Sequence, residues 1–178
     1  NLDLQLERVF GRRALITAQV HGEPIMLWHC DNKPDMTGLD FVQTERLEIP
    51  KWLRHEQPAH ICDLLFYKLG WLYGGLFLGL DTISIRPALD LLGDNSAVFS
   101  QDVPNATDTK HPYSNHFVAR KKSPVLRQLL DDAMERVLYT PEQWGYTGPA
   151  LLTDVVNGNG RAAAAPFPAL CGWQGSHI

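Results

Sequence analysis

Apolar residues recur every three or four positions in two long stretches of the chain, and this spacing predicts helices. The clearer stretch runs over 60–73 and stops at Gly74-Gly75, a pair that readily ends a helix. The other follows Ser123-Pro124, where serine is the expected N-cap and proline the expected first helical residue, and it continues to residue 137. Less regular spacings predict two further helices, over 2–20 and 150–156.

Short apolar runs bounded by turn-forming residues predict the strands. They lie at 25–28, 40–43, 76–80, 82–85, 97–100 and 116–119. The stretch 101–114 and the tail from residue 161 have little periodicity, so we expect loops there. Helices that alternate with short apolar strands are typical of an α/β fold with a mostly parallel central sheet flanked by helices. At 178 residues, the chain is expected to form a single domain over 1–178.

Composition narrows the classes of partner. Hydrophobic residues make up 44% of the chain, charged residues 20%, and the formal net charge is -4, which is typical of a globular protein. No broad positive field exists to attract a phosphate backbone, so we expect no nucleic-acid partner. No apolar run approaches the roughly 20 residues that span a bilayer, so we expect no membrane span. The cysteines, Cys30, Cys62 and Cys171, are too few for a disulfide framework and are expected to be buried thiols.

One acidic residue stands out by its position. Asp81 lies between the apolar runs 76–80 and 82–85, where an unpaired carboxylate is costly to bury. Two interpretations fit this placement. Asp81 is either a ligand of a divalent cation at the end of a strand, or a turn residue that caps two strand segments.

The order of several motifs resembles a known family. Asp63 and Tyr67 precede Tyr73-Gly74-Gly75, and an apolar stretch then leads to Asp81. This order resembles the signature of glycosyltransferase family 32 and its sugar-binding-region relatives, in which Asp-x-x-Arg-Tyr and Tyr-Gly-Gly precede Asp-x-Asp. Further similarity is found at Leu6-Glu7-Arg8, His21-Gly22 to Trp28, Arg86-Pro87, Asn115 to Ala119 and Thr147-Gly148-Pro149.

The resemblance implies a GT-A fold and a retaining transfer of a hexose to a glycan or other hydroxyl acceptor. The implied donor is a nucleotide sugar, most simply a UDP sugar, and the implied cofactor is Mn²⁺ or Mg²⁺, which neutralises the departing diphosphate. The family normally opens with a nucleotide-contacting strand that is not found ahead of Asn1. We therefore expect the domain to lack its first strand and part of its C-terminal end.

The resemblance also assigns roles to individual residues. By the match, Asp81 binds the metal, and a late histidine, His177, either completes the metal shell or is an exposed residue near the chain end. The implied donor site contains Asp63, Tyr67, Tyr73, Gly74, Gly75 and Asp81. The implied acceptor side contains Asn115, Gly148 and Pro149.

Two positions depart from the family pattern. Asp-x-Asp reads Gly79-Leu80-Asp81 here, and the arginine of Asp-x-x-Arg is Phe66. Each change removes a charge-assisted contact worth roughly 1.5–3 kcal/mol, so metal and donor should bind more weakly. The alternative function is therefore a degenerate, non-catalytic module of the same architecture that binds carbohydrate or protein. An unrelated α/β hydrolase is disfavoured, because no Gly-x-Ser-x-Gly motif is present.

Overall fold

A computed structural model of the chain describes residues 24–29, 38–54, 56–79, 89–101, 113–139, 145–158 and 162–165. Contacts divide these residues into two compact units, one with the described residues up to 54 and the other with those from 56 onward. Each unit is described by itself. The helix expected over 2–20, the strand expected over 82–85, Asp81 and His177 lie outside the described residues.

The smaller unit contains two paired strands. β1 (Ile25–His29) runs parallel to β2 (Val42–Arg46), and the short 3-10 helix η1 (Lys51–Leu53) follows. The strand expected at 25–28 is confirmed. The second strand begins later than expected, at Val42, because a turn closed by the hydrogen bond from the Val42 amide to the Leu39 carbonyl occupies the preceding residues.

The larger unit is built on a four-stranded sheet in the order β3-β5-β4-β6. The strands are β3 (Gly75–Phe77), β4 (Ala97–Gln101), β5 (Tyr113–Ala119) and β6 (Ala162–Ala165). β5 is antiparallel to both β3 and β4, whereas β4 is parallel to β6. The α/β class is confirmed, but this sheet is mixed and not mostly parallel.

Two strands lie partly or wholly where loops were expected. β5 begins at Tyr113, inside the predicted loop 101–114, and β6 lies in the tail beyond residue 161. Alanine is a poor strand former, so the run that forms β6 gives no local signal of a strand. Its pairing with β4 provides the hydrogen bonds that the local sequence does not predict.

The helices confirm the apolar spacing. They are α2 (Pro58–Tyr73), α3 (Pro124–Tyr139), α4 (Pro149–Gly158) and the 3-10 helix η2 (Leu89–Leu92). Ser123 precedes α3 as expected, and its carbonyl accepts the hydrogen bond from the Arg127 amide. Its hydroxyl, however, is buried without a hydrogen-bond partner, so it does not act as a side-chain cap. No helix in the described part of the chain is both long and apolar enough to cross a membrane.

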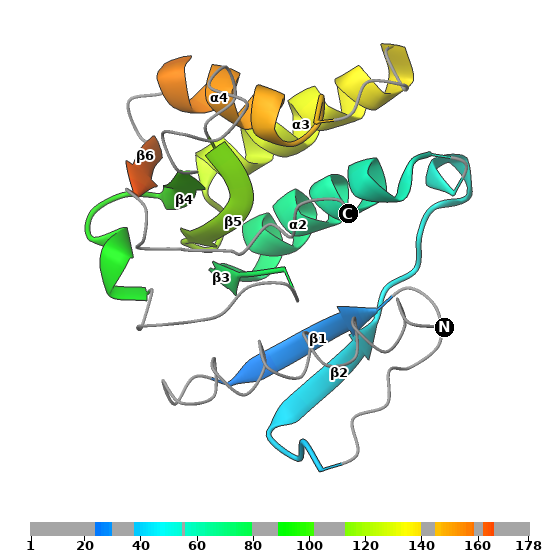
Figure 1. The fold of residues 1–178 in the computed structure, drawn as a ribbon, viewed down its shortest axis with the longest axis vertical. Coiled ribbons are helices and arrows are strands. Elements are labelled where there is room, and N and C mark those ends of the chain that lie inside the picture. The colour runs from blue at the N-terminus through cyan, green and yellow to red at the C-terminus, as the bar shows by residue number, and fades with distance from the viewer. Residues whose placement is uncertain are drawn as a thin grey trace, which may run out of the picture. The chain divides into compact units, whose positions relative to one another are not determined.

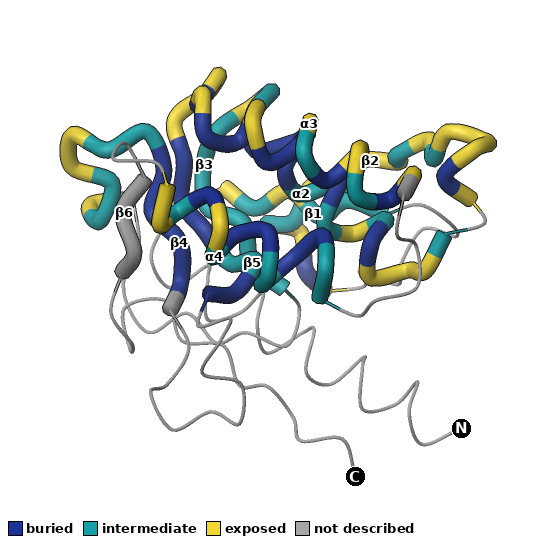
Figure 2. The backbone as a smooth tube through the Cα atoms, turned by 90° about the horizontal axis from the view of Figure 1, so that it is seen from above, coloured by how far each residue is buried: buried dark blue, intermediate teal, exposed yellow. Residues whose placement is uncertain are grey.

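Helix α2 lies close to both β5 and α3 (Figure 1). The close approach depends on Gly70, because a Cβ atom there would lie 2.7 Å from Phe117 Cε2 and 2.8 Å from Leu126 Cδ1. Phe117 is fully buried, and its ring stacks on Phe77 at 4.9 Å between centroids. Figure 2 shows this burial along β4 and β5, the centre of the larger unit's core.

The expectation that the cysteines are buried is wrong for Cys62. Cys62 is exposed on α2 and does not form a disulfide. Position 62 lies outside the helix face that carries Tyr67 and Gly70, so helical spacing turns it toward solvent. Cys30 and Cys171 lie outside the described residues.

Candidate functional site

The candidate site lies where one face of α2 meets one face of β5. Asp63, Tyr67 and Gly70 are four and then three residues apart, so they share a helix face. Asn115 and Phe117 are two residues apart, so they share a strand face. With Gly70 against Phe117, the same alignment brings Asp63 and Tyr67 to Asn115.

The Asp63 carboxylate is held by two side chains from distant parts of the chain. The Asn115 amide Nδ2 donates a hydrogen bond to Asp63 Oδ1. The Thr147 hydroxyl donates to Asp63 Oδ2 at 2.7 Å. Charge-assisted hydrogen bonds of this kind are stronger than bonds between neutral groups, so they fix the carboxylate plane.

The Tyr67 hydroxyl contacts both of these partners, Asn115 and Thr147. Its hydroxyl oxygen lies 3.0 Å from Asn115 Oδ1 and 3.0 Å from the Thr147 carbonyl oxygen, so its single hydrogen is shared between two acceptors. Tyr67 and Thr147 are fully buried, whereas Asp63 and Asn115 are partly exposed. Burial and the neighbouring Asp63 charge raise the pKa of Tyr67 well above 10, so its hydroxyl stays a donor.

Asp63 is the acidic group of the site whose pKa is moved into the neutral range. Burial raises the pKa of its carboxyl from 3.8 to about 7, and the hydrogen bond from Thr147 opposes the rise. Both protonation states therefore occur near neutral pH. The network accepts both, because the Thr147 hydroxyl can rotate to receive a proton that Asp63 carries.

Gly148 lies directly against this network. A Cβ atom at Gly148 would lie 2.9 Å from Asp63 Oδ2 and 3.2 Å from Asn115 Nδ2. The next residue, Pro149, begins α4. Sequence reasoning assigned Asp63 and Tyr67 to the donor and Asn115, Gly148 and Pro149 to the acceptor, but the structure brings Asp63, Tyr67, Asn115 and Gly148 to one place.

The junction of α2 and β3 contains Tyr73, Gly74 and Gly75, three further residues of the expected donor site. Gly74 has φ +69, and a Cβ atom there would lie 2.6 Å from the Lys121 amide nitrogen, so its close backbone contact is within the protein. Gly75 has φ +104 and open space around its Cα. Tyr73 is 60% exposed. A donor-binding role for these three residues stays a prediction.

The described residues do not by themselves fit a metal ion. They contain no group of three or more His, Cys, Asp or Glu side chains that could hold one. Asp81 and His177 lie outside the described residues, so the expectation that they bind Mn²⁺ or Mg²⁺ stays a prediction.

The position of the expected family arginine belongs to the core. Phe66 packs edge-on against Phe77 at 5.9 Å and against Phe117 at 6.5 Å between ring centroids. A phenylalanine at this position has no hydrogen-bond donor to offer Asp63. Asp63 is instead oriented by the neutral Asn115 and Thr147.

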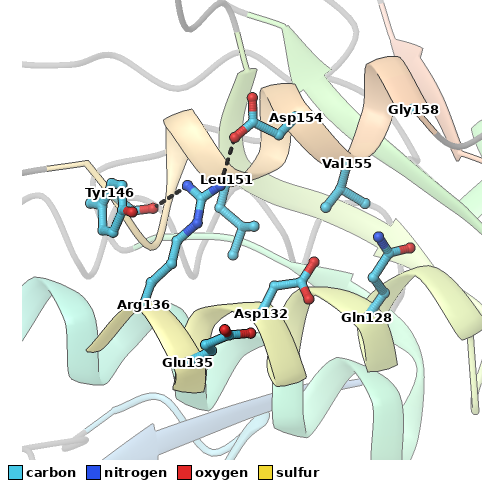
Figure 3. A pocket seen from close by; sticks show the side chains of 9 residues that line it. All are labelled: Gln128, Asp132, Glu135, Arg136, Tyr146, Leu151, Asp154, Val155 and Gly158. Carbon is cyan, nitrogen blue, oxygen red and sulfur yellow. Dashed lines mark hydrogen bonds and ion pairs between the residues drawn. The ribbon is translucent and has the colours of Figure 1, made fainter. Parts of the chain in front are cut away.

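A cleft of about 440 Å³ opens between α3 and α4, beside the turn that carries Thr147 (Figure 3). Figure 3 shows Arg136 reaching from α3 across this cleft toward Tyr146 and Asp154, which its guanidinium binds. Three carboxylates, Asp132, Glu135 and Asp154, also line it.

Sequence reasoning missed two residues in and beside the candidate site, Thr147 and Arg136. Thr147 was noted only as part of a turn, although its neighbour Gly148 signalled a close approach of backbone to side chains. Arg136 gave no local signal, because a single arginine in the last turn of a helix is ordinary. The contact of Arg136 spans 10 positions along the chain and that of Thr147 spans 84, so neither follows from local sequence.

No protein-family model and no curated protein matches this sequence. Among solved structures, the chain is similar to the PaToxG glycosyltransferase, with a TM-score of 0.48 and 13% sequence identity over 85% of this chain and 75% of that one. Such a distant likeness does not establish a shared activity. The case for a function therefore rests on this chain's own residues, and membership of glycosyltransferase family 32 stays a prediction.

Proposed function

We propose that this chain is a glycosyltransferase domain that binds a nucleotide sugar at the Asp63 network and transfers the hexose to a hydroxyl acceptor. One observation supports it above the others: Asp63, Tyr67, Asn115 and Gly148, which resemble family landmarks spread along the sequence, converge on one carboxylate. A resemblance by chance would not require these positions to meet.

The chemistry of the network suits sugar hydroxyls. Among the described residues, each Asp63 oxygen accepts one hydrogen bond, which leaves further lone pairs on a partly exposed carboxylate. The second hydrogen of Asn115 Nδ2 is a donor beside them. A carboxylate acceptor next to an amide donor matches two neighbouring hydroxyl groups of a sugar or ribose, since each hydroxyl can both donate and accept.

The cation stays part of the proposal as an expectation. When bound, Mn²⁺ or Mg²⁺ would neutralise the charge that develops on the departing diphosphate, with Asp81 as the expected ligand. The role of Asp63 is separate from that chemistry. It orients the donor through hydroxyl groups, and the ionised form binds them most strongly because it is a charged acceptor.

The test is the release of nucleoside diphosphate from four donors in the presence of Mn²⁺: UDP-glucose, UDP-galactose, UDP-N-acetylglucosamine and GDP-mannose. We expect release from at least one donor above the protein-free rate. Asp63→Asn should lower that rate roughly 10- to 100-fold, because it removes a charge-assisted hydrogen bond. In the unsubstituted chain the rate should rise with pH through about 7, as the Asp63 carboxyl ionises.

The matched control is Asp131→Asn. Asp131 forms an exposed ion pair with Arg127 on α3, and its side chain is 50% exposed. This variant should release diphosphate at the unsubstituted rate. The proposal is wrong if no donor is cleaved, or if Asp63→Asn and Asp131→Asn behave alike.

A degenerate, non-catalytic module is the second candidate, and two residues favour it. Gly79 stands where the family has the first metal-site aspartate, and Phe66 is packed into the aromatic core in place of the arginine. Gly79→Asp separates the two candidates. Metal-dependent donor hydrolysis that appears only in Gly79→Asp supports degeneration, whereas an active parent chain excludes it.

A further inference from the structure

We infer that Arg136 is a positioning residue for the candidate site, because it holds the Tyr146-Thr147 peptide so that the Thr147 hydroxyl meets Asp63. The inference deepens the proposed function and rests on it for its purpose. It concerns how the Asp63 carboxyl is held, so it is tested at that carboxyl whether or not the chain transfers sugar.

The guanidinium makes two contacts with Tyr146 in the turn and one with Asp154 of α4. Arg136 Nη1 donates to the Tyr146 carbonyl at 2.8 Å, and Nη2 donates to Asp154 Oδ2 at 2.6 Å. The guanidinium carbon also lies 4.6 Å above the Tyr146 ring. A planar fork that is fixed at both prongs and stacked on a ring has little freedom, so it orients the peptide that it binds.

The peptide that Arg136 orients continues directly into the site. Tyr146 is followed by Thr147, whose hydroxyl donates to Asp63 and whose carbonyl lies 3.0 Å from the Tyr67 hydroxyl oxygen. On its other side, the turn is closed by hydrogen bonds from the Gly148 and Ala150 amides to the Gly145 carbonyl. Movement of the Tyr146 carbonyl would therefore move the Thr147 hydroxyl away from Asp63.

A simple ion pair between α3 and α4 does not explain this geometry. The Asp154 side chain is 64% exposed, and an ion pair with such a partner contributes little to stability. Arg136 itself is only 20% exposed, and its first prong binds a carbonyl and not a carboxylate. The bond to the Tyr146 carbonyl is the contact that links Arg136 to the site.

Charged groups surround the guanidinium on both helices that it joins. Asp132 and Glu135 of α3 and Asp154 of α4 line the cleft with it. Arg136 also acts electrostatically on Tyr67: burial raises the pKa of Tyr67, and the positive charge of Arg136 opposes part of that rise. A test must therefore separate an effect of position, through Thr147, from a direct effect of charge.

The experiment measures the ionisation of Asp63 by carbon NMR of its carboxyl group in the full chain. Thr147→Val removes the hydroxyl that favours the ionised form, so the pKa of Asp63 should rise by roughly one unit. Arg136→Met should raise it by a similar amount. Asp154→Asn, which keeps the bond from Arg136 to the Tyr146 carbonyl, should leave it unchanged.

The double variant Thr147→Val/Arg136→Met decides between position and charge. If Arg136 acts through Thr147, the double variant has the same Asp63 pKa as Thr147→Val alone. If Arg136 acts through its charge, the two effects add, and the inference is overturned. Arg136→Lys keeps the positive charge but lacks the planar guanidinium. It provides a second test if Arg136→Met does not fold. If the Asp63 pKa in Arg136→Lys equals that of the unsubstituted chain, the inference is also overturned.

Discussion

Asp63 is the residue at which three separate parts of the chain meet. It stands on α2, its amide partner Asn115 stands on β5, and its hydroxyl partner Thr147 stands in the turn before α4. Tyr67 and Thr147 are buried, so replacing their hydrogen bonds by bonds to water would cost free energy. The protein therefore holds a partly exposed carboxyl group in one orientation and in an environment that disfavours its charge.

The raised pKa of Asp63 predicts how stability depends on pH. Between about pH 4 and about pH 7 the folded state keeps the proton on Asp63 and the unfolded state releases it, so the free energy of unfolding falls as the pH rises. The full effect is on the order of 4 kcal/mol. Asp63→Asn cannot ionise and should lose this dependence.

The measurement is urea denaturation of the unsubstituted chain, Asp63→Asn and Asp131→Asn at several pH values. The difference in unfolding free energy between the first two should move in favour of Asp63→Asn as the pH rises. Asp131→Asn should follow the unsubstituted chain. A constant difference over this range would contradict a raised pKa at Asp63.

Gly148 is the second residue whose identity the site requires. Gly148→Ala places a methyl group 2.9 Å from Asp63 Oδ2, so the carboxylate and Asn115 must shift. Overpacking of this kind costs about 1–3 kcal/mol, which thermal or urea denaturation detects. Gly158→Ala at the end of α4 is the control, because among the described residues no atom beyond its chain neighbours and its own helix backbone lies within 4 Å of the added carbon. Equal stabilities of the two variants would show that the site tolerates a side chain at Gly148.

At the scale of elements, α2 and β5 position the site through glycines as much as through polar residues. Gly70 lets α2 approach Phe117 and Leu126 closely. At the end of the helix, Gly74 turns the chain into β3 while its Cα lies against the backbone of the turn before α3. These two contacts fix how closely α2 approaches β5 and where the helix lies along its axis. They thereby set the distance from Asp63 to Asn115.

The adjacent glycines after α2 provide a matched pair. Gly74→Ala and Gly75→Ala both place a side chain at positive φ, but only Gly74→Ala also brings a Cβ atom within 2.6 Å of the Lys121 amide nitrogen. Strain at such a φ costs of order 1–2 kcal/mol in either variant. Gly74→Ala should be clearly less stable than Gly75→Ala by urea denaturation. Equal losses would mean that the turn before α3 moves freely.

For the larger unit, the elements were more predictable than their assembly. Helical spacing located α2 and α3 closely because each buries one face, and short apolar runs located β4 and most of β5. Strand direction was not predictable, since period-two alternation is the same in parallel and antiparallel pairs. The run of alanines in β6 becomes a strand only through its pairing with β4.

For the candidate site, too, the residues were more predictable than the way in which they assemble. The resemblance selected Asp63, Tyr67, Asn115 and Gly148, and the structure brings them together. It could not show that the residues assigned to donor and acceptor form one network, because they lie about 50 to 85 positions apart and meet only in the fold. Thr147 and Arg136 were missed for the same reason. Asp81 and His177 lie outside the described residues, and their expected roles stay predictions.

The central claim is that the Asp63 network binds a nucleotide sugar, and the side-chain amide of Asn115 reports on it most directly. NMR titration of the unsubstituted chain with each of the four donors should shift the Asn115 amide signals saturably for at least one donor. The NMR signals of the Gln128 side-chain amide should not shift, because Gln128 lines the separate cleft between α3 and α4. A donor that shifts Gln128 while Asn115 is unchanged, or no shift of Asn115 with any donor, would contradict the account.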